Sequence, residues 1–244
     1  MDPIQITYRV ARDDTVEVIV LELHPESLDL LSHPDDLPPW TRLDYHKCPH
    51  CPLASAEHEH CPAAVSLVDI VKRFNNVASH DEVDVEIVTS DRTMFRETTS
   101  QKAVGSLFGL LMASSGCPHT SFLKPMARFH LPLATQEETI YRVTGMYLLA
   151  QYFLRREGKE SDDDLAGLRL LYDNLHTVNV GIASRIRQWT EDDSSVNAIA
   201  ILDVFASMVP FAIEDELVRI ERLFSPYLSD FYDDTILSQL HDEE

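Results

Sequence analysis

Four cysteines, each followed directly by a proline, constrain the fold of this chain more than any other feature. Three of them lie in the stretch 44–62, and the fourth lies far downstream: Cys48, Cys51, Cys61 and Cys117. Because nothing in polar loop chemistry requires a proline after every cysteine, we interpret the four sulfurs as one site. Such a site would tie the stretch 44–62 to the loop at Cys117.

The spacing of these cysteines is typical of metal ligands. A Cys-x-x-Cys turn such as Cys48–Cys51 can direct two sulfurs at one ion, and Zn²⁺ takes four thiolates tetrahedrally at ~2.3 Å. Proline is favoured at the first helical position, so that Cys61 and Cys117 can each occupy an N-cap, where the helix dipole favours a thiolate. The sequence therefore predicts a Cys₄ metal site, with structural zinc as the first choice. An iron–sulfur cluster suits the same ligands.

Several alternatives to four sulfur ligands remain open. Either His46 or His50, which flank the cysteine turn, could replace Cys117, and His119 could also join the site. The cysteines could equally be small core residues or a redox-active pair. A disulfide framework is not expected in a chain of this size that starts Met-Asp-Pro rather than with a secretory leader.

The net charge of the chain limits the kinds of partner that it is expected to bind. It carries 20 basic and 41 acidic residues, a formal net charge of −21. Nucleic-acid binding needs clusters of Lys and Arg, so no nucleic-acid partner is expected. The apolar stretch 104–113 is too short to cross a bilayer, so we expect no membrane association and a cytoplasmic protein. A protein partner and the oligomeric state are left open.

The first half of the chain predicts a small sheet. Residues 4–11 and 16–23 alternate apolar and polar side chains around a turn, as do 83–88 and 93–98. A helix is expected between the two hairpins, from 62 to about 77. The order ββαββ predicts an α+β fold in which a four-stranded antiparallel sheet carries a helix on one face.

The second half predicts helices. An apolar helix is expected over 101–114, and a capping box of Thr135 and Glu138 begins another that ends before Gly158. Further helices are expected from Ser161, from Ser195 to a stop at Pro210, and on either side of Pro226.

We therefore divide the chain into an α+β region, 1–133, which carries the metal site, and a helical region, 134–244. We expect the two regions to pack as one compact unit.

The segment 115–142 is the best candidate for further chemistry. It gathers ionisable side chains on a loop that enters a helix: His119, Arg128, His130, Glu137, Glu138 and Arg142. The arginines could bind a carboxylate or phosphate bidentately, and an imidazole could act as a general base. The plainer alternative is that Arg128 and Arg142 pair with nearby acidic residues and that His130 caps a helix.

Four motifs resemble those of a family of uncharacterised conserved bacterial proteins, a domain of unknown function. The motifs occupy residues 48–53 (CPHCPL), 115–119 (SGCPH), 124–132 (KPMARFHLP) and 137–142 (EETIYR). The resemblance runs over most of the chain and implies a bacterial cytoplasmic protein, without assigning an activity.

Three functional hypotheses follow. The first is a cytoplasmic protein with a structural Cys₄ zinc site in an interaction or regulatory role. The second is an iron–sulfur redox protein or enzyme that uses Arg128 and His130. The third is a zinc hydrolase with an open coordination position. Whether the protein is an enzyme is left open, because the sequence has no Gly-rich phosphate loop, serine elbow or His-Glu-x-x-His motif.

Overall fold

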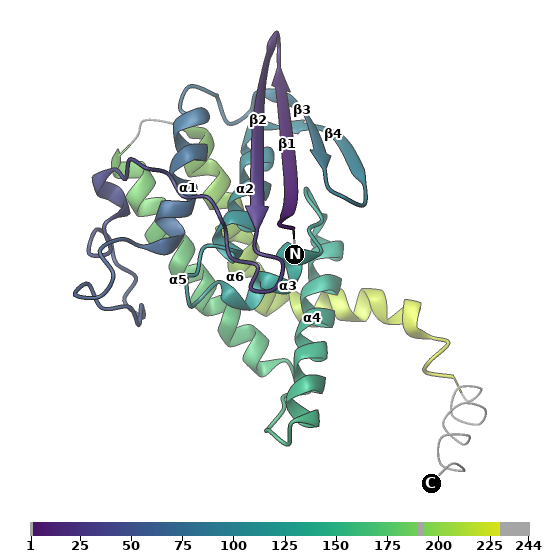
Figure 1. Cartoon of the computed structure of the whole chain (residues 1–244). Coiled ribbons are helices and arrows are strands. Elements are labelled where there is room, and N and C mark those ends of the chain that lie inside the picture. Colours follow the sequence, from purple (N-terminus) through teal and green to yellow (C-terminus); the bar gives the residue numbers. More distant parts are fainter. Residues whose placement is uncertain (1, 190–192, 230–244) are drawn as a thin grey trace.

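The computed structural model of the protein describes residues 2–189 and 193–229 (Figure 1). The sheet consists of four antiparallel strands in the order β2-β1-β3-β4: β1 (Ile4–Arg12), β2 (Thr15–Leu23), β3 (Glu82–Val88) and β4 (Thr93–Thr99). With α1 (Pro62–Arg73) between the two hairpins, the predicted ββαββ order and the α+β class are confirmed.

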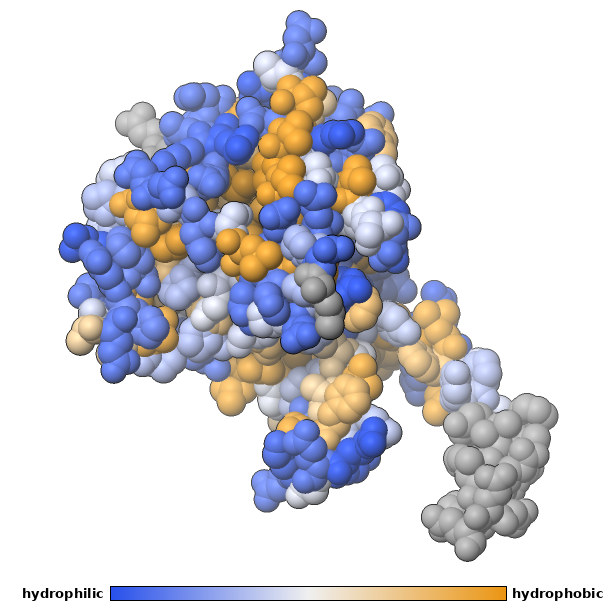
Figure 2. Space-filling model, in the orientation of Figure 1, coloured by the Kyte–Doolittle hydropathy of each residue, from blue (hydrophilic) through white to orange (hydrophobic). Residues whose placement is uncertain are grey.

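One face of the sheet is buried, as the alternating pattern predicts. The buried side chains come from the first three strands: Ile6, Tyr8, Val10, Ile19, Leu21, Leu23, Val83, Val85 and Ile87. On the opposite face, Val16, Val18 and Val20 of the edge strand β2 are exposed. Figure 2 shows a run of hydrophobic residues over β2, surrounded mainly by hydrophilic ones.

Two helices pack close to the sheet. Helix α1 begins at Pro62 with Cys61 at its N-cap, as predicted, but it ends at Arg73 rather than near residue 77. Helix α2 (Ser100–Ala113) is mostly buried and contacts β3 and β4. Its Gly105 faces α6 (Asp193–Glu221) so closely that a Cβ there would lie 3.5 Å from the Ala198 carbonyl oxygen.

The short η1 (Pro39–Thr41) lies between β2 and α1, and the other helices follow the sheet region in the sequence. They are the short η2 (Ser121–Leu123), α3 (Lys124–Arg128) and η3 (Arg222–Phe224), and the long α4 (Gln136–Arg156) and α5 (Ala166–Trp189). The predicted capping box opens α4: the Glu138 N–H donates to Thr135 Oγ1 at 3.2 Å, and the Thr135 N–H donates to Glu138 Oε2 at 2.7 Å.

The predicted stop at Pro210 is wrong, because α6 continues through this residue to Glu221. A proline removes one backbone donor, and the packing of α6 against α2 and α5 outweighs this loss. The helix predicted between Pro210 and Pro226 is thus the C-terminal part of α6. Most of the last predicted helix lies outside the described residues.

The main hydrophobic core joins both halves of the chain. Val178, Ile182 and Ile186 of α5 belong to the same buried cluster as the sheet and α2. The boundary at residues 133 and 134 stays a prediction. Within the described residues, no helix combines the length and the apolar character that crossing a bilayer requires.

Candidate functional site

All four cysteines line one small pocket of about 20 Å³. Cys48 and Cys51 come from the turn after η1, Cys61 precedes α1, and Cys117 follows α2. Helix α5 closes the pocket, and its Gly181 lies so near that an added Cβ would stand 3.0 Å from Cys48 Sγ.

The predicted metal-binding function is nevertheless wrong. Among residues 2–189 and 193–229, no group of three or more histidine, cysteine, aspartate or glutamate side chains is placed to hold a metal ion. The hypothesis of a structural zinc site formed by Cys48, Cys51, Cys61 and Cys117 fails on this finding. The iron–sulfur and zinc-hydrolase alternatives fail with it, because both need such a metal group.

The cysteines pack as small apolar side chains. Cys61 and Cys117 are buried within the main core, and Cys48 and Cys51 pack against it. Burial, together with the neighbouring cysteines, raises the pKa of Cys48 to about 11, and burial also raises the pKa of Cys117. Desolvation therefore favours neutral thiols in the metal-free protein.

Arg185 of α5 holds the chain beside this pocket. Its guanidinium is buried, 1% exposed, and donates to the carbonyl oxygens of Trp40, Arg42 and Leu43 at 2.8, 2.7 and 3.0 Å. These hydrogen bonds satisfy the backbone of the segment that leads into the cysteine turn. The role of Arg185 is therefore structural.

The histidines considered as alternative ligands bind other groups. His50 and His119 stack at 3.9 Å between ring centroids, and the His119 Nε2–H donates to the His50 carbonyl oxygen at 3.0 Å. His50 Nε2–H donates in turn to the carbonyl oxygen of Asn174 on α5. His46 is exposed and lies edge-on against Tyr45. Through its hydrogen bond to Asn174, the His50 ring thus joins the cysteine turn to α5.

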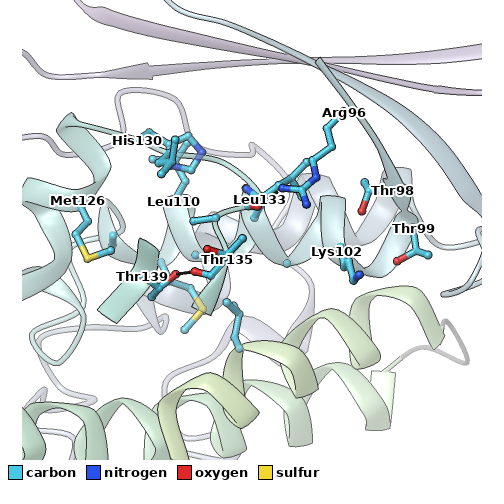
Figure 3. A pocket seen from close by; sticks show the side chains of 18 of the residues that line it. Arg96, Thr98, Thr99, Lys102, Leu110, Met126, His130, Leu133, Thr135 and Thr139 are labelled. Carbon is cyan, nitrogen blue, oxygen red and sulfur yellow. Dashed lines mark hydrogen bonds between the residues drawn. The ribbon is translucent and has the colours of Figure 1, made fainter. Parts of the chain in front are cut away.

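A far larger cavity, of about 920 Å³, lies between the sheet and the helices (Figure 3). Its wall takes residues from β3, β4 and every helix from α2 to α6. The volume is within the range of ~300–1,000 Å³ that is usual for small-molecule sites. Figure 3 shows Arg96 and Lys102 at the end where Thr98 and Thr99 lie, and His130 and Met126 at the other end.

The base of the cavity is apolar and its rim is charged. Leu110, Tyr172 and Leu175 are buried side chains of the wall, whereas Arg96 and Lys102 are exposed. Exposed acidic residues also contribute to the rim: Asp13, Glu82, Asp84 and Glu97. The arrangement suits a ligand with an apolar body.

A hydrogen-bonded chain of side chains lies in one wall. Tyr8, which is fully buried, bonds to His130 Nε2 and, at 2.9 Å, to Ser106 Oγ. The Leu133 N–H donates to Ser106 Oγ at 3.3 Å. Burial, with a smaller contribution from Arg142, lowers the pKa of His130 to about 3. His130 is therefore a neutral imidazole fixed against Tyr8, not the helix cap of the plainer alternative.

Arg142 presents a cation to the cavity. Its Nη2 donates to the carbonyl oxygens of Met126 at 3.3 Å and Phe129 at 2.7 Å. Burial lowers the pKa of Arg142. The side chain makes no ion pair within the part of the chain that the structure describes. The expected pairing of Arg142 with a nearby acidic residue is therefore absent there.

Glu138 lies close enough to Arg142 to favour its charged form but makes no salt bridge with it. It precedes Arg142 by one helical turn, the spacing at which a Glu–Arg pair forms on a helix surface. Its carboxylate instead accepts the Thr135 N–H in the capping box. The same hydrogen bond lowers the pKa of Glu138.

Asn179 of α5 lines the same cavity and was not singled out from the sequence. It is 1% exposed, and neither its Oδ1 nor its Nδ2 has a hydrogen-bond partner in the described chain. Its position in an apolar helical stripe gives no signal in the sequence. Arg128, by contrast, is exposed, lies over the Phe129 ring, and does not line the cavity.

Comparison with known proteins identifies the family without adding an activity. No curated protein and no solved structure matches the chain significantly. One family model, described as a domain of unknown function (DUF6901), matches residues 4–225, which include every strand and helix described above. The predicted relation to an uncharacterised family is thereby confirmed. The chain belongs to the family defined by the domain of unknown function DUF6901.

Proposed function

We propose that this protein binds a small organic anion with an apolar body in the cavity between the sheet and the helices. The observation that carries the proposal is Arg142, a partly buried cation on the cavity wall without an ion pair among the described residues. Desolvating a charge is costly unless an opposite charge compensates it. Glu138 supplies part of that compensation without a salt bridge, and an anionic ligand in contact with Arg142 would supply the rest.

Arg142 keeps donors for an anionic ligand. Its Nη2 is used by two carbonyl oxygens, which leaves Nε and Nη1. Both paired faces of a guanidinium include Nη2, so an anion oxygen would accept a charge-assisted hydrogen bond from Nε or Nη1 singly. The neutral imidazole of His130, close enough for Arg142 to affect its pKa, adds a polar contact without a competing charge.

The buried apolar side chains support an apolar body for the ligand. Leu110 and Leu175 would cover it, and each CH₂ group removed from water contributes about 0.8 kcal/mol. Since the chain carries a net charge of −21, an anion would gain little from long-range attraction. The affinity would therefore depend on the local contact with Arg142.

A matched pair of fluorescent probes tests the proposal. 8-Anilinonaphthalene-1-sulfonate is an apolar anion, and N-phenyl-1-naphthylamine is its uncharged counterpart. We expect Arg142→Met to weaken binding of the anion about tenfold or more, from the loss of a charged contact of about 1.5–3 kcal/mol. Binding of the uncharged probe should change less than twofold.

Arg156→Met is the matched control, because Arg156 lies on the same helix, is exposed and does not line the cavity. Arg142→Lys, which keeps the charge, separates loss of charge from loss of folding, and circular dichroism would monitor each variant. Equal binding of the anion by wild type and Arg142→Met, with both folded, would contradict the proposal.

We also propose a cytoplasmic location and no nucleic-acid partner. All four cysteines are free thiols, which supports a reducing compartment, and the net charge of −21 opposes contact with phosphates. Cell fractionation tests the location, since recovery in an osmotic-shock fluid would contradict it. Retention on a heparin column at physiological salt would argue against the proposal that the protein has no nucleic-acid partner.

A further inference from the structure

Asn179 indicates that the cavity recognises a second polar group. Its carboxamide is 1% exposed and unpartnered at both Oδ1 and Nδ2 within the described residues, although it lines the cavity. Buried polar groups in native proteins nearly always have a hydrogen-bond partner. A carboxamide offers both a donor and an acceptor, so its complement is a group that accepts and donates side by side.

The position of Asn179 relative to Arg142 follows from helix geometry. Tyr172, Leu175 and Asn179 line the cavity at positions i, i+3 and i+7, which share one face of α5. Arg142 lies near the first of them, because Met126, whose carbonyl oxygen accepts from Arg142, packs against the buried cluster that contains Tyr172. Seven residues at 1.5 Å each separate Tyr172 from Asn179 by about 10 Å along the helix.

The wall between these two groups is apolar. Leu175 lies between Tyr172 and Asn179 on α5, and Leu110 of α2 also lines the cavity; both are buried. A ligand that reaches from Arg142 to Asn179 along α5 would therefore pass an apolar section of this helix. Hydrocarbon fits this section better than a polar chain.

From this arrangement we propose that the ligand is an extended carboxylic acid whose far end carries a carboxamide-like group bound by Asn179. This inference rests on the proposed function and specifies its ligand class. An extended chain advances ~3.6 Å for every three bonds, so about eight bonds separate the two ends. The monoamide of nonanedioic acid has this length.

Calorimetry with two isosteric ligands tests the inference. The monoamide of nonanedioic acid and 9-methyldecanoate have the same carboxylate and nearly the same shape, but the second ends in an isopropyl group that cannot form hydrogen bonds. We expect the wild type to bind the monoamide at least tenfold more tightly. Monoamides shorter or longer by two methylenes should bind more weakly than the matched one.

Substitution of Asn179 should reverse this preference. In Asn179→Leu the monoamide would leave its own amide unpartnered, so we expect the isopropyl ligand to bind more tightly. Asn174→Leu is the matched control on the same helix, because Asn174 does not line the cavity, and it should keep the wild-type preference.

The outcomes distinguish the two proposals. If the wild type binds both ligands with equal affinity, or prefers the isopropyl ligand, the role of Asn179 is wrong while carboxylate binding stands. A preference for the monoamide that survives in Asn179→Leu would overturn the inference in the same way. If neither ligand binds the wild type, the proposed function fails as well.

Discussion

Replacing Asn179 by leucine should stabilise the ligand-free protein. The side chain is 1% exposed and buries one donor atom and one acceptor atom that find no partner among the described residues. An unsatisfied buried group costs about 1–3 kcal/mol, and an apolar side chain of similar size removes that cost. We therefore expect Asn179→Leu to raise the free energy of unfolding by about 2 kcal/mol.

Thermal and urea unfolding measure this effect. For a protein of this size, about 2 kcal/mol corresponds to an increase in Tm of about 4–8 °C. Leucine also has a higher helix propensity than asparagine, by a few tenths of a kcal/mol. Asn174→Leu makes the same exchange on the same helix outside the cavity, so subtracting its effect removes this contribution.

A loss of stability in Asn179→Leu would refute the reasoning, because it would show that the native amide has partners. An increase no larger than that of Asn174→Leu would refute it too. The expected gain carries a functional cost: the variant that stabilises the empty cavity is also the one expected to lose the preference for the monoamide. Stability and binding should therefore move in opposite directions at this one position.

Three further substitutions test other parts of the structure. The pKa of His130 is lowered to about 3, so unfolded protein takes up a proton near pH 6.5 while folded protein does not. The contribution of His130 to the free energy of unfolding is therefore fully present above pH 6.5 and is lost as the pH falls toward 3. Between pH 7 and pH 5, the free energy of unfolding of His130→Gln, measured by urea titration, should decrease by about 2 kcal/mol less than that of the wild type. Arg185→Met should lower the free energy of unfolding by about 3 kcal/mol, against almost no change in the exposed control Arg187→Met; equal effects would contradict the buried hydrogen bonds. Thr135→Ala should cost about 1 kcal/mol by removing the capping box, and an unchanged urea midpoint would show that the cap contributes nothing.

Local patterns predicted much of the fold. The alternation of apolar and polar residues around Ile6 and Ile19 depends only on neighbours within one strand. The bounds of both hairpins were therefore predicted closely. The cap formed by Thr135 and Glu138 likewise depends on residues three apart. The predicted stop at Pro210 was wrong because long-range packing of α6, which no local pattern contains, outweighs one missing donor.

The candidate site was predictable only in part. The segment 115–142 drew attention to His130 and Arg142, because ionisable side chains concentrate there. Arg142 has no ion pair among the described residues because the carboxylate of Glu138 accepts the Thr135 N–H instead. Which of these two partners Glu138 contacts depends on the three-dimensional structure and cannot be read from the sequence. The Cys-Pro pattern predicted a metal site that the described residues do not form, because the cysteines pack as apolar side chains in and against the core.

The hydrogen bonds of Arg185 have a consequence for folding during synthesis. They join α5 to carbonyl groups more than 140 positions earlier in the chain, at Trp40, Arg42 and Leu43. A ribosome delivers the segment around Trp40 long before residue 185, so these three hydrogen bonds cannot form until α5 emerges. Contacts so distant in sequence form slowly, because a long loop has to close first. The cysteine turn should therefore dock late, after both β-hairpins have already formed.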